Sequence, residues 1–323
     1  MRYSQSEKIE VIRIVENSNL SVRKTLRELD ISPSTFYSWY GKYLEGGYDA
    51  LENNHKAPKQ FWNAIPEWEK DRIVDVARTF PEKSCREIAC YIIDNLGYYV
   101  SESSVYRILK AKDLIQSPVF TLISAKDKFQ HPTTRVNQLW QTDFTYFKII
   151  NWGWYYLSTI LDDFSRYIIA WKLCTTMTAE DVKDTLDIAI EKTGVTHVKV
   201  VSRPRLLTDN GPCYVSAHLK DYLEIQEMAH TRGRPYHPQT QGKIERYHRS
   251  MKNLILLDNY YTPEALEDQI STWVDYYNNH RYHEAIDNIT PSDKFHGRDQ
   301  RILKKRKAVK KKTMRIRRQI NMS

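Results

Sequence analysis

Residues 139–150 begin Leu139-Trp140-Gln141-Thr142-Asp143-Phe144-Thr145-Tyr146, a run rich in the Thr, Phe and Tyr residues that are typical of β-strands. Residues 154–161 and 167–173 have the same character, and the turn Asp162-Asp163-Phe164-Ser165 separates them. Three adjacent strands predict an antiparallel meander. A helical pattern over residues 179–192, an interrupted strand over residues 198–208 and helices near residues 216–223 and 241–257 follow. This order of strands and helices indicates an α/β layer fold.

Two helical modules precede this region. Apolar residues recur at helical spacing three times within residues 1–50, and Ser32-Pro33 predicts the N-cap and first turn of the third helix. The tight turn before that helix predicts a helix-turn-helix, whose last helix would present Ser34, Thr35, Ser38 and Lys42 to a DNA major groove. A three-helix bundle used for protein contacts is the alternative.

The same layout recurs in residues 66–116, where Gly97 breaks the chain and Ser101 or Ser103 precedes the third helix. We therefore predict two all-α helix-turn-helix domains, at residues 1–50 and 66–116. Residues 51–65 and 117–134 are the predicted linkers. The α/β core is expected over residues 135–296, and a basic tail over residues 297–323.

Composition excludes several classes of protein. The 323 residues are 41% hydrophobic and 28% charged, which is typical of a soluble globular chain of two or more domains. The longest apolar runs are short and the first residues lack a signal peptide, so we expect an intracellular, cytoplasmic protein without membrane contact. The four cysteines form no C-x-x-C pair, so neither disulfides nor a zinc knuckle is expected.

The net charge of +9 is concentrated at the end of the chain. Residues 298–323 contain twelve Lys or Arg and one Asp, whereas the preceding residues contain 37 basic and 39 acidic side chains. The runs Lys304-Lys305-Arg306-Lys307 and Lys310-Lys311-Lys312 predict a tail that is disordered in the free protein, with a small strand pair as the alternative. Against a duplex, Lys305, Arg306 and Lys311 would contact phosphates independently of DNA sequence.

Three carboxylates in the core stand out by position. Asp143 lies among apolar and aromatic residues, where burial of its charge is favourable only if something binds it. Asp209 ends a strand, at the edge where open α/β sheets place ligands, although an ordinary Asp-Asn-Gly turn would look the same. Glu245 lies one turn into the helix after Gly242, where a solvated helix face is the ordinary interpretation.

Taken together, the three acids resemble the triad of the DDE transposases and retroviral-type integrases, which share a ribonuclease H-like core. Further segments carry this resemblance, which covers roughly residues 137–295 and extends to bacterial insertion-sequence transposases. They are Asp162-Asp163-Phe164-Ser165-Arg166, Asp209-Asn210-Gly211-Pro212, His237-Pro238-Gln239-Thr240-Gln241-Gly242-Lys243-Ile244-Glu245-Arg246, and Tyr277-Asn278-Asn279-His280-Arg281-Tyr282-His283 followed by Thr290-Pro291.

This resemblance implies a mixed five-stranded sheet with flanking helices, and a DNA transposase that cleaves strands at the ends of a mobile element and transfers them to a target. Asp143 would bridge two Mg²⁺ ions, and Asp209 and Glu245 would each hold one; Mn²⁺ could substitute. Two such ions about 3.5–4 Å apart neutralise the entering and leaving oxygens of a phosphodiester displacement. Carboxylate oxygens are the ligands that Mg²⁺ prefers. The nucleophile would be water for nicking and a DNA 3′-hydroxyl for strand transfer.

The resemblance also implies partners and DNA contacts. Double-stranded DNA, both terminal repeats and target, and a homo-oligomer assembled on it are expected, in a bacterial cytoplasm at the nucleoid. His237 and Lys243 flank the third acid and could touch phosphate, with ordinary loop polarity as the alternative. Arg246, Arg249 and Lys252 could track the DNA backbone, or form a solvated basic face. We expect Glu245 to join the other acids when DNA docks.

Two other classes of function remain open at this stage. A helix-turn-helix transcription regulator needs only residues 1–116, but leaves the acidic triad unexplained. A ribonuclease H-like nuclease would use the acids without needing two DNA readers in tandem.

Overall fold

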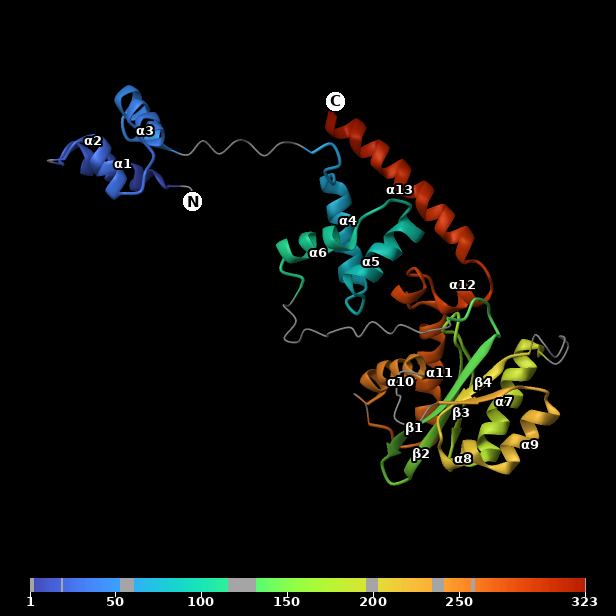
Figure 1. Cartoon of the computed structure of the whole chain (residues 1–323). Coiled ribbons are helices and arrows are strands. Elements are labelled where there is room, and N and C mark those ends of the chain that lie inside the picture. The colour runs from blue at the N-terminus through green and yellow to red at the C-terminus, as the bar shows by residue number, and fades with distance from the viewer. Residues whose placement is uncertain are drawn as a thin grey trace. The chain divides into compact units, whose positions relative to one another are not determined.

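The computed structural model describes residues 3–18, 20–52, 61–115, 132–195, 203–233, 241–256 and 259–322. The chain divides into two units, Met1–Trp62 and Asn63–Ser323 (Figure 1). Most of both predicted linkers, the first part of the strand predicted over residues 198–208, and the candidate DNA contact His237 lie outside the described residues.

The first unit is a helix-turn-helix. Helices α1 (Gln5–Glu16), α2 (Val22–Glu28) and α3 (Pro33–Gly46) and the short helix η1 (Asp49–Leu51) enclose a small core, to which Ile12, Leu26, Phe36 and Leu51 contribute fully or almost fully buried side chains. The Ser32 hydroxyl accepts a hydrogen bond from the Thr35 N–H at 3.3 Å, so Ser32 caps α3 as its sequence predicts. The helix-turn-helix prediction for this unit is confirmed.

The second unit begins with another helix-turn-helix. It consists of α4 (Glu67–Thr79), α5 (Cys85–Tyr91), the π-helical turn η2 (Ile92–Leu96) and α6 (Glu102–Ala111). Gly97 ends η2 with a φ of +71°, a left-handed conformation that glycine adopts without strain. Of the two serines predicted as caps, Ser101 caps α6 by accepting from the Ser104 N–H at 3.2 Å.

The α/β core is built on a mixed five-stranded sheet. Its strands are β1 (Leu139–Ile149), β2 (Gly153–Asp162), β3 (Ile168–Cys174), β4 (Arg205–Thr208) and β5 (His230–Arg232), in the order β3-β2-β1-β4-β5. The first three form the predicted antiparallel meander, whereas β4 and β5 run parallel to β1. The predicted sheet is therefore confirmed, and the turn at residues 162–166 connects β2 to β3.

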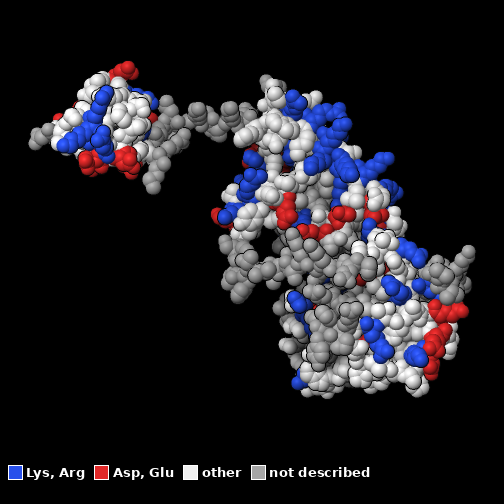
Figure 2. Space-filling view, viewed as in Figure 1, with Lys and Arg blue, Asp and Glu red and all other residues white. Residues whose placement is uncertain are grey.

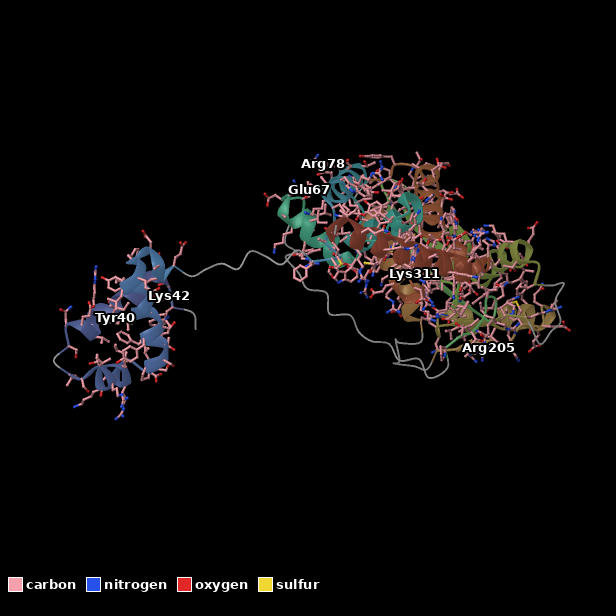
Figure 3. The ribbon with its side chains drawn as sticks, turned by 90° about the horizontal axis from the view of Figure 1, so that it is seen from above. Tyr40, Lys42, Glu67, Arg78, Arg205 and Lys311 are labelled. Atoms are coloured by element: carbon pink, nitrogen blue, oxygen red, sulfur yellow. The ribbon has the colours of Figure 1, made fainter. Side chains whose placement is uncertain are left out.

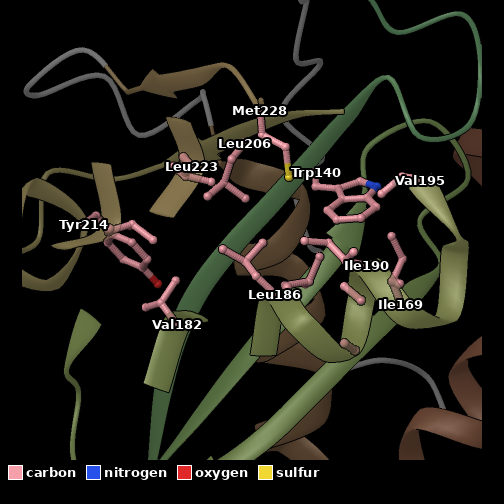
Figure 4. Packing of buried hydrophobic residues seen from close by; sticks show 14 residues of the cluster. Trp140, Ile169, Val182, Leu186, Ile190, Val195, Leu206, Tyr214, Leu223 and Met228 are labelled. Carbon is pink, nitrogen blue, oxygen red and sulfur yellow. The ribbon is translucent and has the colours of Figure 1, made fainter. Parts of the chain in front are cut away.

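Helices cover both faces of this sheet. On one face α7 (Ala179–Thr193), α8 (Pro212–Val215) and α9 (Ala217–Ile225) pack around the fully buried Trp140 (Figure 4). On the other face α10 (Gly242–Ile255) and α11 (Pro263–Asn279) pack on Phe147, Leu157 and Ile168. The alternation of side chains along β1 thus sends even-numbered residues to the α7 side and odd-numbered residues to the α10 side.

The basic tail is a helix, so the predictions of disorder and of a small strand pair are wrong. After η6 (Glu284–Ile286) and α12 (Pro291–Phe295), helix α13 spans Asp299–Met322. Most of its residues have good helix propensity, and Thr313 and Arg317 are buried against the rest of the second unit. Lysines and arginines cover its outer side (Figure 2), where water screens their mutual repulsion.

Two ion pairs attach α13 to the second helix-turn-helix. Arg317 pairs with Glu69 of α4, with 3.0 Å between Nε and Oε2, and its Nη2 donates to the Tyr99 carbonyl at 2.7 Å. Arg306 donates to both carboxylate oxygens of Asp94 at 2.8 and 2.6 Å. Arg306, predicted to contact phosphate, is therefore held within the protein. Lys311 of α13, which Figure 3 labels, is exposed.

Among the described residues, no helix combines the length and the apolar character needed to cross a membrane.

Candidate active site

Asp143 and Asp209 lie on adjacent parallel strands. Leu207 of β4 is in register with Gln141 of β1. Continuing this register by two residues brings Asp209, just beyond the end of β4, beside Asp143. Because side chains alternate with a period of two, both carboxylates belong to the α10 side of the sheet. Neighbouring strands are about 4.8 Å apart, so the sheet brings two acids that are far apart in sequence into one location.

Buried polar contacts fix the start of α10, and therefore Glu245, against the same part of β1. The side-chain Oε1 of Gln141 accepts from the Ile244 N–H at 3.2 Å, and the side-chain Nε2 of Gln241 donates to the Thr142 backbone carbonyl at 3.3 Å. Lys243 is buried, and its Nζ lies 2.5 Å from Asp163 Oδ2 in the β2–β3 turn. These contacts anchor the first turn of α10, where Glu245 is exposed to solvent.

The three carboxylates share an electrostatic environment. Partial burial, followed by the negative charge of Asp143, raises the pKa of Glu245. Burial and the charge of Asp209 raise the pKa of the Cys213 thiol to about 11, and Asp143 contributes to the same shift. The pKa of Tyr214 is raised well above its usual value by burial and then by Asp143. The Cys213 thiol thus responds to both aspartates, and Glu245 responds to Asp143.

Further contacts orient the two aspartates. His248 of α10 is buried, with Nδ1 3.5 Å from Asp143 Oδ2 and Nε2 3.3 Å from the Thr159 hydroxyl oxygen. The Phe144 N–H donates to Asp143 at 2.9 Å, and the Gly211 N–H donates to Asp209 at 2.8 Å. Sequence reasoning missed the roles of His248, Gln141 and Asp163; a signal for His248 was its position one turn after Glu245 on the same helix.

The donor set suits a hard divalent cation. All three candidate ligands offer carboxylate oxygens, and a cation between them would relieve the repulsion that already raises the pKa of Glu245. Within the described parts of the chain, no group of three or more His, Cys, Asp or Glu side chains is close enough to hold a metal ion. Joint coordination by the triad would therefore require Glu245 or the Asp209 turn to move closer.

The candidate DNA contacts differ in their surroundings. Ser34, Ser38 and Lys42 are exposed on α3, whereas the Thr35 hydroxyl is 2.7 Å from the Ser32 hydroxyl at the cap. Figure 3 labels Lys42 on the first unit. On α10, Arg246 and Arg249 are exposed and Lys252 is partly buried, while Lys243 is ion-paired in the interior. Lys305 of α13 is exposed, with Nζ 3.4 Å from the Asp94 carbonyl oxygen.

This strand order, with acids on adjacent parallel strands and on the helix that covers them, defines an α/β core of the ribonuclease H-like class. Residues 133–238 match the family described as integrase core domain, and residues 226–291 match a second family with the same description. Residues 7–59 match a helix-turn-helix domain, and residues 35–109 a homeodomain-like domain. Residues 133–291 are therefore similar to integrase core domains, and the residues before them are similar to helix-turn-helix and homeodomain-like domains.

The relatives that the chain resembles include a bacterial transposase and retroviral polyproteins. The chain is 27% identical over 282 residues to the transposase for transposon Tn552 of Staphylococcus aureus, covering 79% of this chain and 57% of that protein. It is 32% identical over 120 residues to the Gag-Pro-Pol polyprotein of squirrel monkey retrovirus, covering 37% of this chain and 6% of the polyprotein. A solved structure of the HTLV-2 integrase catalytic core domain in complex with magnesium is 22% identical, with a TM-score of 0.39, covering 50% of this chain and 98% of that one.

Proposed function

We propose that this protein is a DNA transposase, which binds the ends of a mobile element and catalyses divalent-metal-dependent strand cleavage and strand transfer. The proposal is supported by the strand register, which puts Asp143 and Asp209 at neighbouring positions, by the contacts that hold the Glu245-bearing helix against β1, and by the match to an integrase core domain. Two helix-turn-helix modules precede this core, which favours a transposase over a nuclease without DNA readers.

The proposed division of labour among the residues follows their positions. Asp143, Asp209 and Glu245 would hold two Mg²⁺ ions, which supply charge neutralisation at the scissile phosphate. The contacts of Gln141, Asp163 and Lys243 hold the end of α10 that carries Glu245 against β1 and the β2–β3 turn, and Glu245 would move closer to the two aspartates when DNA docks. His248 and the Phe144 N–H orient the Asp143 carboxylate. The exposed Arg246 and Arg249 would contact the phosphates of the bound strand.

Duplex binding would combine base contacts with phosphate contacts. Ser34, Ser38 and Lys42 of α3 are proposed to face a major groove, as the last helix of a helix-turn-helix does. The exposed lysines of α13, including Lys304, Lys307 and Lys311, would add phosphate contacts. We further propose a homo-oligomer on DNA, because two element ends must be joined to one target.

A supercoiled plasmid that carries candidate element ends, taken from the DNA on either side of the gene, tests this function. With Mg²⁺ we expect nicked and joined products, which disappear on addition of EDTA. Asp143→Asn and Glu245→Gln should each reduce product formation at least 100-fold, on the order of the 3 kcal/mol that loss of one key electrostatic group costs. Glu267→Gln, an exposed glutamate on the neighbouring α11, is the matched control and should retain activity.

The alternatives predict different products. Specific binding of the ends without any strand chemistry, in the wild type and the variants alike, would identify a regulator. Degradation of RNA–DNA hybrids without joining of DNA would identify a nuclease. Full activity in the Asp143→Asn variant would remove the acids from the mechanism altogether.

A further inference from the structure

An exposed pair of aromatic rings lies on the same strand as Asp143. Tyr146 of β1 is 54% exposed and Trp154 of β2 is 52% exposed, and their rings meet edge to face with centroids 5.4 Å apart. Register places Trp154 opposite Lys148 and Tyr146 opposite Tyr156, so the rings are diagonal neighbours on one face of the hairpin. We call Tyr146 and Trp154 the aromatic platform.

The sheet topology explains why the platform is uncovered. Strand β4 pairs with β1 only at residues 139–141, so beyond that point β1 has no partner on that side within the described residues. Phe147 and Ile149 remain buried under α10 and α11, whereas Tyr146 and Lys148, which alternate with them, are exposed. A contiguous pair of half-exposed rings is the kind of apolar patch that marks a binding surface.

Positive charge flanks both rings. The Nζ of Lys252, on α10, lies 4.1 Å from the centroid of the Tyr146 ring, and the Nζ of Lys148 lies 5.9 Å from that of Trp154. Aromatic rings beside lysine ammonium groups are suited to bind a nucleic acid strand, because the bases can stack on the rings while the phosphates pair with lysine. A membrane or an apolar protein surface would leave these charges without partners.

The platform is also close to the candidate active site. Tyr146 follows Asp143 by three residues on one strand, about 10 Å along the chain, and the alternation of side chains puts the two on opposite faces of β1. Lys252 of α10, the helix on the Asp143 side of the sheet, nevertheless reaches the Tyr146 ring beside the edge of β1 that β4 does not pair. The negative charge of Asp143 acts on the Lys252 ammonium, which lies over the Tyr146 ring. A strand whose phosphate reaches Asp143 could therefore place a nearby base on the platform.

We propose that Tyr146 and Trp154 form a stacking site for unpaired bases of the DNA strand that flanks the scissile phosphate, with Lys148 and Lys252 on the neighbouring phosphates. This proposal rests on the proposed function, and adds a preference for strands that are unpaired beside the reacting bond. Duplex ends that are frayed or mismatched there should consequently be bound more tightly than fully paired ends.

The test compares the full chain bound to fluorescein-labelled oligodeoxythymidylate and to an abasic phosphodiester strand of the same length. We expect the wild type to prefer the base-bearing strand. Tyr146→Ala and Trp154→Ala should each weaken its binding about 5- to 100-fold, while the abasic strand is bound as before. Tyr146→Phe and Trp154→Phe, which retain ring faces, should bind within about twofold of the wild type.

Trp152→Ala is the matched control, since Trp152 is 58% exposed in the adjoining turn but lies outside the ring pair. An equal effect of Trp152→Ala, or an unchanged base preference in the two platform variants, would overturn the proposal. A loss of self-association in the platform variants, without a loss of base preference, would also overturn the proposal. That result would identify a second copy of the chain as the occupant of the platform. If nicking that depends on Asp143 persists in those cases, the proposed function stands; if the wild type neither binds nor nicks DNA, both fail.

Discussion

Removing the Glu69 carboxylate should release α13 from the second helix-turn-helix. Glu69 and Arg317 are each 3% exposed in their side chains, and Glu69→Ala would leave the guanidinium buried with the Tyr99 carbonyl as a remaining acceptor. Loss of one partner of a buried ion pair costs about 3–5 kcal/mol, because the other charge stays desolvated. The population of undocked helix should therefore rise at least about 100-fold.

Trypsin reports this population directly, because α13 is rich in lysine and arginine. At low protease concentration, cleavage follows the equilibrium population of the open form. Fragments ending within residues 299–322, measured by mass spectrometry, should appear at least about 100 times faster in Glu69→Ala than in the wild type. The double variant Glu69→Met with Arg317→Met removes both charges and should regain most of the protection.

The matched control is a second ion pair of the same unit with much greater exposure. Arg86 and Glu284 lie 2.5 Å apart, but their side chains are 31% and 79% exposed. Glu284→Ala should cost at most about 1 kcal/mol, so that cleavage accelerates no more than about fivefold. If Glu69→Ala and Glu284→Ala were cleaved equally fast, burial would not be what gives the Arg317–Glu69 contact its strength.

Three further outcomes are expected. Burial and then the nearby Arg281 lower the pKa of His283 to about 3 from an ordinary value of 6.5. Between these two pKa values the unfolded state binds more protons than the folded state, so the stability of the fold falls as pH drops. In urea unfolding, the wild type should therefore lose about 2 kcal/mol more stability between pH 7 and 5 than His283→Phe. If Lys307 and Lys311 contact phosphates, changing both to Gln should reduce the slope of log affinity against log salt by about 2, and an unchanged slope would place them away from DNA. Asp163→Asn leaves the buried Lys243 without its carboxylate partner, so strand cleavage should slow. DNA affinity, measured by fluorescence anisotropy, should be retained. Weaker DNA binding with normal cleavage would contradict the role of Asp163 in anchoring the start of α10.

The sequence was most informative where one periodicity extends over many residues. The alternation along residues 139–150 predicts β1, and Ser32-Pro33 predicts the start of α3, because both signals are local. Strand β5 gave no such signal, since His230, Thr231 and Arg232 are all polar and the strand forms only by pairing with β4. Tertiary pairing, which single-sequence patterns do not encode, decides such segments.

The site shows the same division between local and long-range information. Position and resemblance single out Asp143, Asp209 and Glu245 in the sequence. The strand register explains how the first two become neighbours. Lys243 pairs with Asp163, which lies 80 residues earlier in the sequence. This contact depends on the fold, and the position of Lys243 next to Glu245 in the sequence could not predict it. The prediction for the tail is wrong for a similar reason. A run of like charges along the sequence predicts disorder, whereas helix α13 spreads these charges around its axis.

The docking of α13 has a consequence for the order of synthesis. Arg317 is made 248 residues after Glu69, so a ribosome adding about 5–20 residues per second leaves the carboxylate without its guanidinium for on the order of 12–50 s. During that interval the emerging α4–α6 module lacks the ion-pair partner of Glu69, which lies in the last helix. Nascent chains that stop before residue 299 should consequently be targets for quality control, and the second DNA-reading module would mature only when translation has passed α13.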